Sequence, residues 1–270
     1  MALITNLGMR FHMDPLRTAE RACAIAQLLS TLESFSAEER KYGGINDWNL
    51  TSILDGSRFS IKDEAFREIF IRGNFIARAA ASFALILPTS NGVRLGATGI
   101  SALSQLLINK YTINGSDGAE QYSAIIFAAC AMGRTDKGKN VDLAVDFIAA
   151  QTVLSYFVAG AVKWLGSEWR NGTAVERVIR TKVYGSRTFY QLLRRWPRVS
   201  ETLTYQTVAV EALFPLLVIS KYTRLPALTT MFLFHAANAR LMGLGRFFIV
   251  FTSTYPAVLA SFGSREEKTK

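Results

Sequence analysis

Apolar stretches alternate with three charged tracts along this chain. The charged tracts cover residues 36–72, 134–142 and 163–201, and few charges interrupt the stretches between them. About 20 apolar residues are needed to cross the roughly 30 Å of bilayer hydrocarbon. The stretch 244–262 comes closest, because its one charge, Arg246, lies near an end from which it can reach the headgroups. The stretches 146–165 and 202–220 also qualify, so the pattern predicts transmembrane helices.

Shorter apolar stretches suggest further spans. They lie near residues 15–34, 74–88, 95–109, 121–133 and 225–240. Short helices can still cross a membrane when a bundle packs around them or the bilayer thins. Only helices satisfy their own backbone groups in lipid, and the alternation that a β-barrel needs is absent. We therefore predict an all-α, polytopic membrane bundle of six to eight transmembrane helices.

The same pattern predicts the organisation and location of the chain. One transmembrane domain is expected, with its core over residues 14–262. The first apolar stretch lacks a convincing cleavage site, so no cleavable signal peptide is expected. We predict a multi-pass protein of the cell membrane, with the lipid bilayer as its first partner.

The tract 167–199 mixes cations with aromatic rings. It holds eight Lys or Arg against two acids. This mixture is typical of an amphipathic helix lying at the headgroups, and a solvated loop is the alternative. In such a helix the side chains of Arg180, Arg187, Arg194 and Arg195 would address headgroups. The side chains of Val178, Leu192 and Leu193 would then turn toward the apolar layer.

Composition narrows the possible partners. The chain is 50% hydrophobic and 19% charged, whereas soluble chains have roughly 25% charged residues. Its net charge of +10 suits anionic lipid, because the basic residues flank apolar helices. No nucleic-acid signature accompanies them, so we expect no nucleic-acid partner. Cys23 and Cys130 are expected to be buried packing residues, and no metal-ligand spacing occurs.

Ionisable residues inside apolar helices are candidates for function, because each is costly in hydrocarbon. Lys163 ends the apolar run 155–164. It is either an anchor that reaches the headgroups or a desolvated amine that serves as a base. Glu211 lies in the middle of 202–220. It is either neutral or paired with a cation on another helix.

Two further polar positions stand out. His235 and Asn238 lie one turn apart and share a helix face; they could bind a ligand or hydrogen-bond between helices. Asp117 precedes a helix that begins near Glu120, and could serve as its cap or as a site residue. We predict that the side chains of Lys163, Glu211 and His235 face a common interior.

The motif Tyr-Phe-Val-Ala-Gly at 156–160, followed by Lys163, resembles the core of the HTTM domain. This is the vitamin K-dependent gamma-carboxylase-like membrane superfamily. Residues 234–239 and 243–247 resemble its later helix motif, and residues 14–17 resemble its first helix. The resemblance covers roughly 14–262.

The resemblance implies roles for particular residues. The lysine of the motif is the proposed base of the vitamin K carboxylase, and it matches Lys163. Independently of the resemblance, we expect Glu211 and His235 to be catalytic together with Lys163, and Asn238, Asp117 and Tyr156 to bind substrate. A quinone-type cofactor is implied by the resemblance alone.

The stretch Asn-Gly-Ser-Asp-Gly at 114–118 and the chain length are similar to the bacterial SdpB branch. The animal carboxylase has a histidine in this stretch, where this chain has Ser116 and Asp117. The SdpB branch is associated with maturing a secreted antimicrobial peptide, so a precursor peptide and a small SdpA-like protein would be partners.

Three hypotheses for function follow. The first is a membrane component of peptide-toxin production and maturation. The second is a membrane-embedded carboxylase or quinone-linked oxygen-chemistry enzyme that uses Lys163 as its base. The third is a non-catalytic immunity or transport protein. The mutual distances of Lys163, Glu211 and His235 are expected to separate the first two.

Overall fold

The fold is helical throughout the part of the chain that the structure describes. The computed structural model describes residues 14–44, 46–47, 64–109, 118–136 and 139–268. Its first elements are α1 (Pro15–Ser34), the 3₁₀ helix η1 (Ala37–Arg40), α3 (Glu64–Ile86), α4 (Asn91–Asn109) and α5 (Gly118–Gly133). They are followed by α6 (Val141–Leu165), α7 (Ser167–Arg170), α8 (Ala174–Ile179), α9 (Arg187–Arg195), α10 (Pro197–Ile219), α11 (Lys221–Met242), α12 (Gly245–Thr252) and α13 (Tyr255–Lys268).

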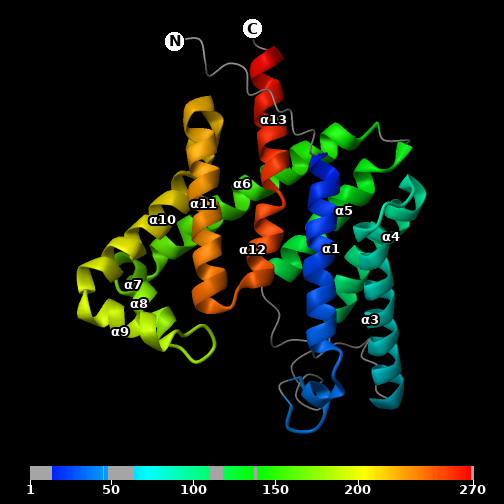
Figure 1. The fold of residues 1–270 in the computed structure, drawn as a ribbon, viewed down its shortest axis with the longest axis horizontal. Coiled ribbons are helices and arrows are strands. Elements are labelled where there is room, and N and C mark those ends of the chain that lie inside the picture. The colour runs from blue at the N-terminus through cyan, green and yellow to red at the C-terminus, as the bar shows by residue number, and fades with distance from the viewer. Residues whose placement is uncertain (1–13, 45, 48–63, 110–117, 137–138, 269–270) are drawn as a thin grey trace.

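The helices form two groups joined by α6 (Figure 1). In the first group α1 packs on α3 and α5, and α4 packs between α3 and α5. The second group holds α10 and α11, with the short helices α7, α8 and α9 at one end. The long helix α6 crosses between the groups and contacts α5, α10 and α13. This crossing carries Lys163, at the end of α6, toward α10.

Asp14 and Pro15 set the start of α1. The Asp14 side chain accepts hydrogen bonds from the backbone N–H of Leu16 and Arg17, at 3.0 and 3.2 Å. Pro15 occupies the first turn, where its missing N–H has no helical partner to lose. These features cap the helix and fix its start.

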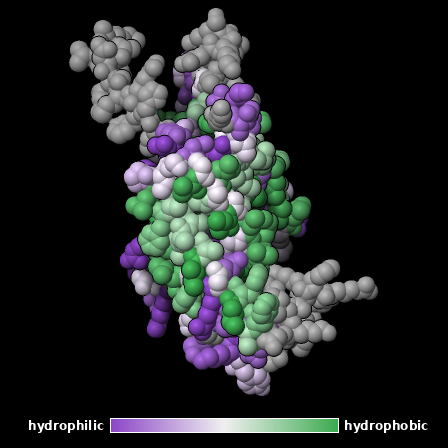
Figure 2. Space-filling view, turned by 90° about the vertical axis from the view of Figure 1, so that its right-hand side faces the viewer, coloured by the Kyte–Doolittle hydropathy of each residue, from purple (hydrophilic) through white to green (hydrophobic). Residues whose placement is uncertain are grey.

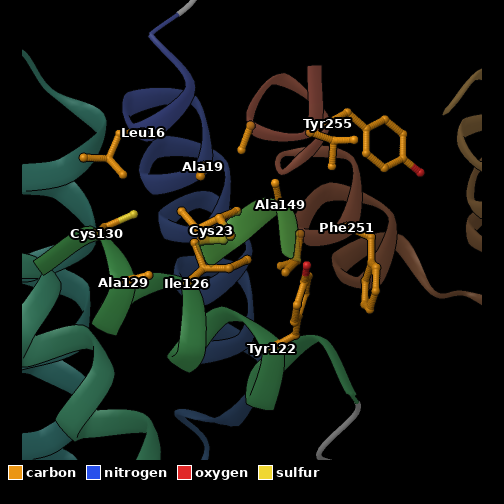
Figure 3. Close-up of a cluster of buried hydrophobic side chains, with 14 of the residues drawn as sticks. Leu16, Ala19, Cys23, Tyr122, Ile126, Ala129, Cys130, Ala149, Phe251 and Tyr255 are labelled. Carbon is orange, nitrogen blue, oxygen red and sulfur yellow. The ribbon is translucent and has the colours of Figure 1, made fainter. Parts of the chain in front are cut away.

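Small side chains hold the first group together (Figure 3). Ala19 and Cys23 of α1 lie against Ala129 and Cys130 of α5, and all four side chains are buried. Small residues let membrane helices approach closely. Both cysteines are free thiols, in keeping with the packing role expected from the sequence.

A buried ionic cluster ties α1 to α4 and α5. The Glu20 carboxylate accepts hydrogen bonds from Arg94 Nε at 2.9 Å and from Arg134 Nη2 at 2.7 Å. Arg94 also donates to the carbonyls of Leu85 and Leu87. The side chains of Glu20, Arg94 and Arg134 are 0%, 1% and 8% exposed. One carboxylate therefore compensates two buried guanidinium groups.

The outer surface carries an apolar belt (Figure 2). On the face formed by α3 and α4, hydrophobic residues lie between hydrophilic ends. Exposed side chains on these helices include Ile76, Phe83, Leu103 and Leu106. Apolar patches of this kind mark membrane or partner surfaces, and the belt fits contact with a lipid bilayer.

Three of the described helices are long and apolar enough to cross a membrane, namely α3, α6 and α10. This finding fits a membrane protein with an all-helical fold. A total of six to eight spans and a multi-pass placement in the cell membrane stay predictions. The helix expected near 74–88 is α3. It begins earlier than expected, at Glu64, because the residues before position 74 belong to the same helix.

The strongest expected span, 244–262, is not one continuous helix, and its crossing of a membrane stays a prediction. It divides into α12 and α13, with a break at Ser253 and Thr254. Pro256 causes the break, since it has no N–H to donate and its ring would clash with the carbonyl of Thr252. The hydroxyls of Ser253 and Thr254 instead bond to carbonyls three residues earlier, at 2.6 and 2.7 Å.

The basic tract 167–199 forms three short helices, α7, α8 and α9, where one amphipathic helix was expected. Leu193 is fully buried and Val178 is partly buried, but Leu192 is exposed. Gly172, which has a φ of 71°, turns the chain between α7 and α8. The four arginines that were expected to address headgroups are exposed. Their position at a membrane surface stays a prediction.

Candidate functional site

A cavity of about 370 Å³ lies between α6, α7–α9, α10, α11 and α12. Small-molecule sites in proteins span roughly 300–1,000 Å³. Its walls are mostly apolar and include the rings of Trp169, Phe189, Phe234, Phe247 and Phe251. The polar residues in the wall include Lys163, Glu211, His235 and Asn238. The structure thus brings the three candidate catalytic residues into one cavity wall.

Lys163 and Glu211 form a close ion pair across α6 and α10. Lys163 Nζ lies 2.5 Å from Glu211 Oε2, and the two side chains are 24% and 6% exposed. The ammonium also lies 5.5 Å from the centre of the Trp169 ring. Of the two states expected for Glu211, the structure has the paired one. Pairing compensates the cost of burying the carboxylate.

Gly160 allows α6 and α10 to come close enough for this pair. A Cβ atom at Gly160 would lie 2.4 Å from the backbone N of Ala212 and 2.9 Å from its Cα. Those atoms belong to the α10 backbone and cannot move without moving the helix. Gly160 lies one turn before Lys163, and Ala212 follows Glu211. The glycine of the Tyr-Phe-Val-Ala-Gly motif therefore sets the spacing at the site.

We expect Gly160→Ala to push α10 away from α6, because the added methyl group overlaps backbone atoms. Overpacking of this kind costs about 1–3 kcal/mol. Thermal unfolding of the purified protein in detergent would measure the loss. Gly99→Ala in α4 is the matched control, since a Cβ there would meet no atom within 4 Å. Equal stability of the two variants would show that Gly160 does not control the helix spacing.

His235 is held by a chain of tyrosine hydroxyls. Its Nε2 lies 2.7 Å from the Tyr156 hydroxyl, which lies 2.9 Å from the Tyr255 hydroxyl. The imidazole is 2% exposed and packs against the rings of Phe247 and Phe251, with centroids 5.3 and 5.2 Å away. Its Nδ1 has no hydrogen-bond partner among the described residues. Tyr156 thus fixes the orientation of the ring.

Asn238 lines the same cavity, one turn after His235. Asp117, the other candidate for substrate binding, lies outside the described residues. Two residues of the site, Tyr255 and Thr207, were not predicted from the sequence. The position of Tyr255 beside the helix-breaking Pro256 is a signal that could have identified it, whereas a single threonine in an apolar helix gives no signal.

The HTTM domain model matches residues 131–260 of this chain. No curated protein and no solved structure matches this chain. Every residue that lines the cavity lies within the matched segment. Residues 131–260 are therefore similar to the HTTM domain.

Proposed function

We propose that this chain is an HTTM-family membrane protein in which Lys163 performs acid–base chemistry on a ligand bound in the cavity. The observation that carries the proposal is the 2.5 Å pair of Lys163 and Glu211 in the wall of a mostly apolar cavity. Ionisable groups in such clefts are candidates for catalysis. A pair that served packing alone would need no cavity beside it.

The pair provides a way to hold and transfer one proton. When that proton lies on the Glu211 carboxyl, Lys163 Nζ has a free electron pair and can accept a proton from a bound substrate. The product is a lysine ammonium that can donate a hydrogen bond to the carbonyl oxygen of the neutral Glu211 carboxyl, and the substrate is left with the negative charge. Trp169, whose ring lies 5.5 Å from Nζ, adds a cation–π contribution in the charged state.

His235 and Asn238 would orient the ligand. They lie on one face of α11 and both line the cavity. Tyr156 holds the imidazole through a hydrogen bond of 2.7 Å, and Tyr255 holds the Tyr156 hydroxyl through one of 2.9 Å. Because the ring is fixed from one side, its position does not have to be established by the ligand. Orientation of this kind lowers the entropic cost of reaching the reactive geometry.

The residues present fit a quinone-type cofactor. The cavity, at about 370 Å³, is large enough for a ring-sized molecule, and the aromatic side chains of Trp169, Phe189 and Phe247 line it. Asn238 would donate to a carbonyl oxygen of such a ring, and Lys163 lies in the same wall. A bound quinone would supply redox chemistry, whereas these side chains would bind it, orient it and exclude water.

Similarity to the SdpB branch supports a role in the production and maturation of an antimicrobial peptide. The substrate would then be a precursor peptide, and a small SdpA-like protein would be a partner. In this setting the apolar cavity would receive a side chain of the peptide, and Lys163 would act on it. In the alternative function, a carboxylase or quinone-linked enzyme would use Lys163 as the base of a different reaction.

Mass analysis separates these functions. Intact masses of secreted peptides and of lipid-soluble molecules would be compared between cells with the wild-type chain, cells with Lys163→Ala and cells without the gene. We expect one molecule whose mass in the wild type differs from that in the other two. A shifted peptide supports maturation, and a shifted lipid-soluble molecule supports the quinone-linked enzyme. Identical masses in all three, with the variant present in membranes, would contradict catalysis and favour immunity or transport.

A further inference from the structure

A second cavity of about 340 Å³ lies between α10 and α11. It shares four lining residues with the first cavity, namely Leu203, Thr207, Glu211 and Phe234. The two cavities therefore border each other, and Glu211 of the candidate catalytic pair lines both. A ligand in the second cavity would lie within reach of the same group as a ligand in the first.

The second cavity runs from the outer surface to Glu211. Its lining includes the exposed Gln206 and Thr230 as well as the buried Glu211 and Met231. Val210, which also lines the cavity, is partly buried and so intermediate in exposure between these two sets of residues. The exposed residues mark its mouth, and the buried ones mark its floor.

The mouth lies near the middle of both helices. Gln206 is nine positions after Pro197, the first residue of α10, and Thr230 is nine positions after Lys221, the first residue of α11. Nine residues advance a helix by about 14 Å. Since α10 is long and apolar enough to cross a membrane, a crossing α10 would place this level within the hydrocarbon layer.

Apolar side chains flank the mouth. Leu213 and Leu216 of α10 are 48% and 66% exposed, and Leu233 of α11 is 61% exposed. Exposed apolar groups of this kind on two neighbouring helices fit contact with lipid. A molecule that enters between these helices would therefore come from the bilayer.

The helix backbone is interrupted next to the floor. Pro215 lies inside α10 and has no N–H, so it cannot donate to the carbonyl of Glu211, its usual acceptor four residues earlier. Prolines inside helices commonly bend them. This interruption lies beside Glu211, which lines both cavities, and it gives α10 a place to bend away from α11.

We propose that the gap between α10 and α11 is a lateral opening through which an uncharged amphipathic molecule with a hydrocarbon tail reaches Glu211 from the bilayer. Its tail occupies the second cavity, and its polar end meets the Lys163–Glu211 pair. This inference rests on the proposed function for the identity of the reacting groups. It adds the class of ligand and the side from which the ligand arrives.

The probe for this opening is hexadecanol with a photoreactive diazirine in the middle of its chain. The full-length protein in lipid nanodiscs would be irradiated with the probe, and the labelled peptides would be mapped by mass spectrometry. We expect adducts on the peptides that carry Val210 and Met231. Thr230→Trp and Gln206→Trp should each reduce this labelling several-fold, because each places an indole at the mouth. Leu216→Trp is the control, since it adds the same side chain to α10 outside the cavity.

Two outcomes would overturn the opening. One is equal labelling of Val210 and Met231 in all four proteins, and the other is labelling confined to the outer residues Leu213, Leu216 and Leu233. Phosphatidylcholine that carries the same diazirine chain is the control probe, because it labels residues in contact with bulk lipid. If both probes labelled the same residues to the same extent, a specific site would also be contradicted. The labelling needs no chemistry at Lys163. Unchanged labelling of Lys163→Ala, together with unchanged product masses, would therefore reject the catalytic proposal and retain the opening.

Discussion

Replacement of Lys163 by arginine is expected to abolish product formation while leaving the protein folded in the membrane. A base must release its proton before it can accept another, and arginine stays protonated in proteins. Proton transfer by a positioned side chain contributes roughly 100- to 10,000-fold to a reaction rate, so both Lys163→Arg and Lys163→Ala should fall by that order. The measurement is the yield of the mass-shifted molecule, normalised to the amount of protein in the membrane.

The arginine variant separates the base from an anchor. Arginine keeps the positive charge, can still pair with Glu211 and can still reach the headgroups. A lysine that only anchors α6 to α10 would therefore tolerate the change. Lys221→Arg is the matched control, because Lys221 is exposed at the start of α11 and lines neither cavity. Wild-type yield from Lys163→Arg would leave the anchor as the only role for this residue.

Glu20→Ala is expected to cause the largest loss of stability in this protein. The substitution leaves Arg94 and Arg134 buried without their shared carboxylate, and these side chains are only 1% and 8% exposed. Removing one partner of a buried ion pair costs about 3–5 kcal/mol, because the remaining charge is uncompensated. The free energy of unfolding, measured by denaturant titration in detergent micelles, should fall by at least that amount.

An exposed ion pair provides the control for Glu20. Glu38 pairs with Lys41 at 2.5 Å, but the two side chains are 75% and 63% exposed. Pairs of this kind contribute about 0–1 kcal/mol, so Glu38→Ala should change stability little. If Glu20→Ala proved as stable as Glu38→Ala, the buried cluster would not hold α1 against α4 and α5.

The sequence predicted the helical class and singled out several residues that line the cavity, because both depend on local properties. Hydrophobic runs indicate helices wherever their backbone groups have to pair internally. The cost of burying a charge makes Lys163 and Glu211 conspicuous in apolar surroundings. His235 and Asn238 were recognised as a pair because helical periodicity places them on one face. None of these inferences requires knowledge of which helices are neighbours.

The tertiary structure alone decided which groups meet. Lys163 and Glu211 are separated by 48 positions, Tyr156 and His235 by 79, and Glu20 and Arg134 by 114. Such pairs form only when helices cross in one particular way, and the crossing depends on shape, as at Gly160 against Ala212. Hydrophobicity also could not decide whether 244–262 was one helix, because steric exclusion at Pro256 overrides an apolar pattern. The lateral cavity between α10 and α11 is likewise a property of two packed surfaces, which neither helix contains in its own sequence.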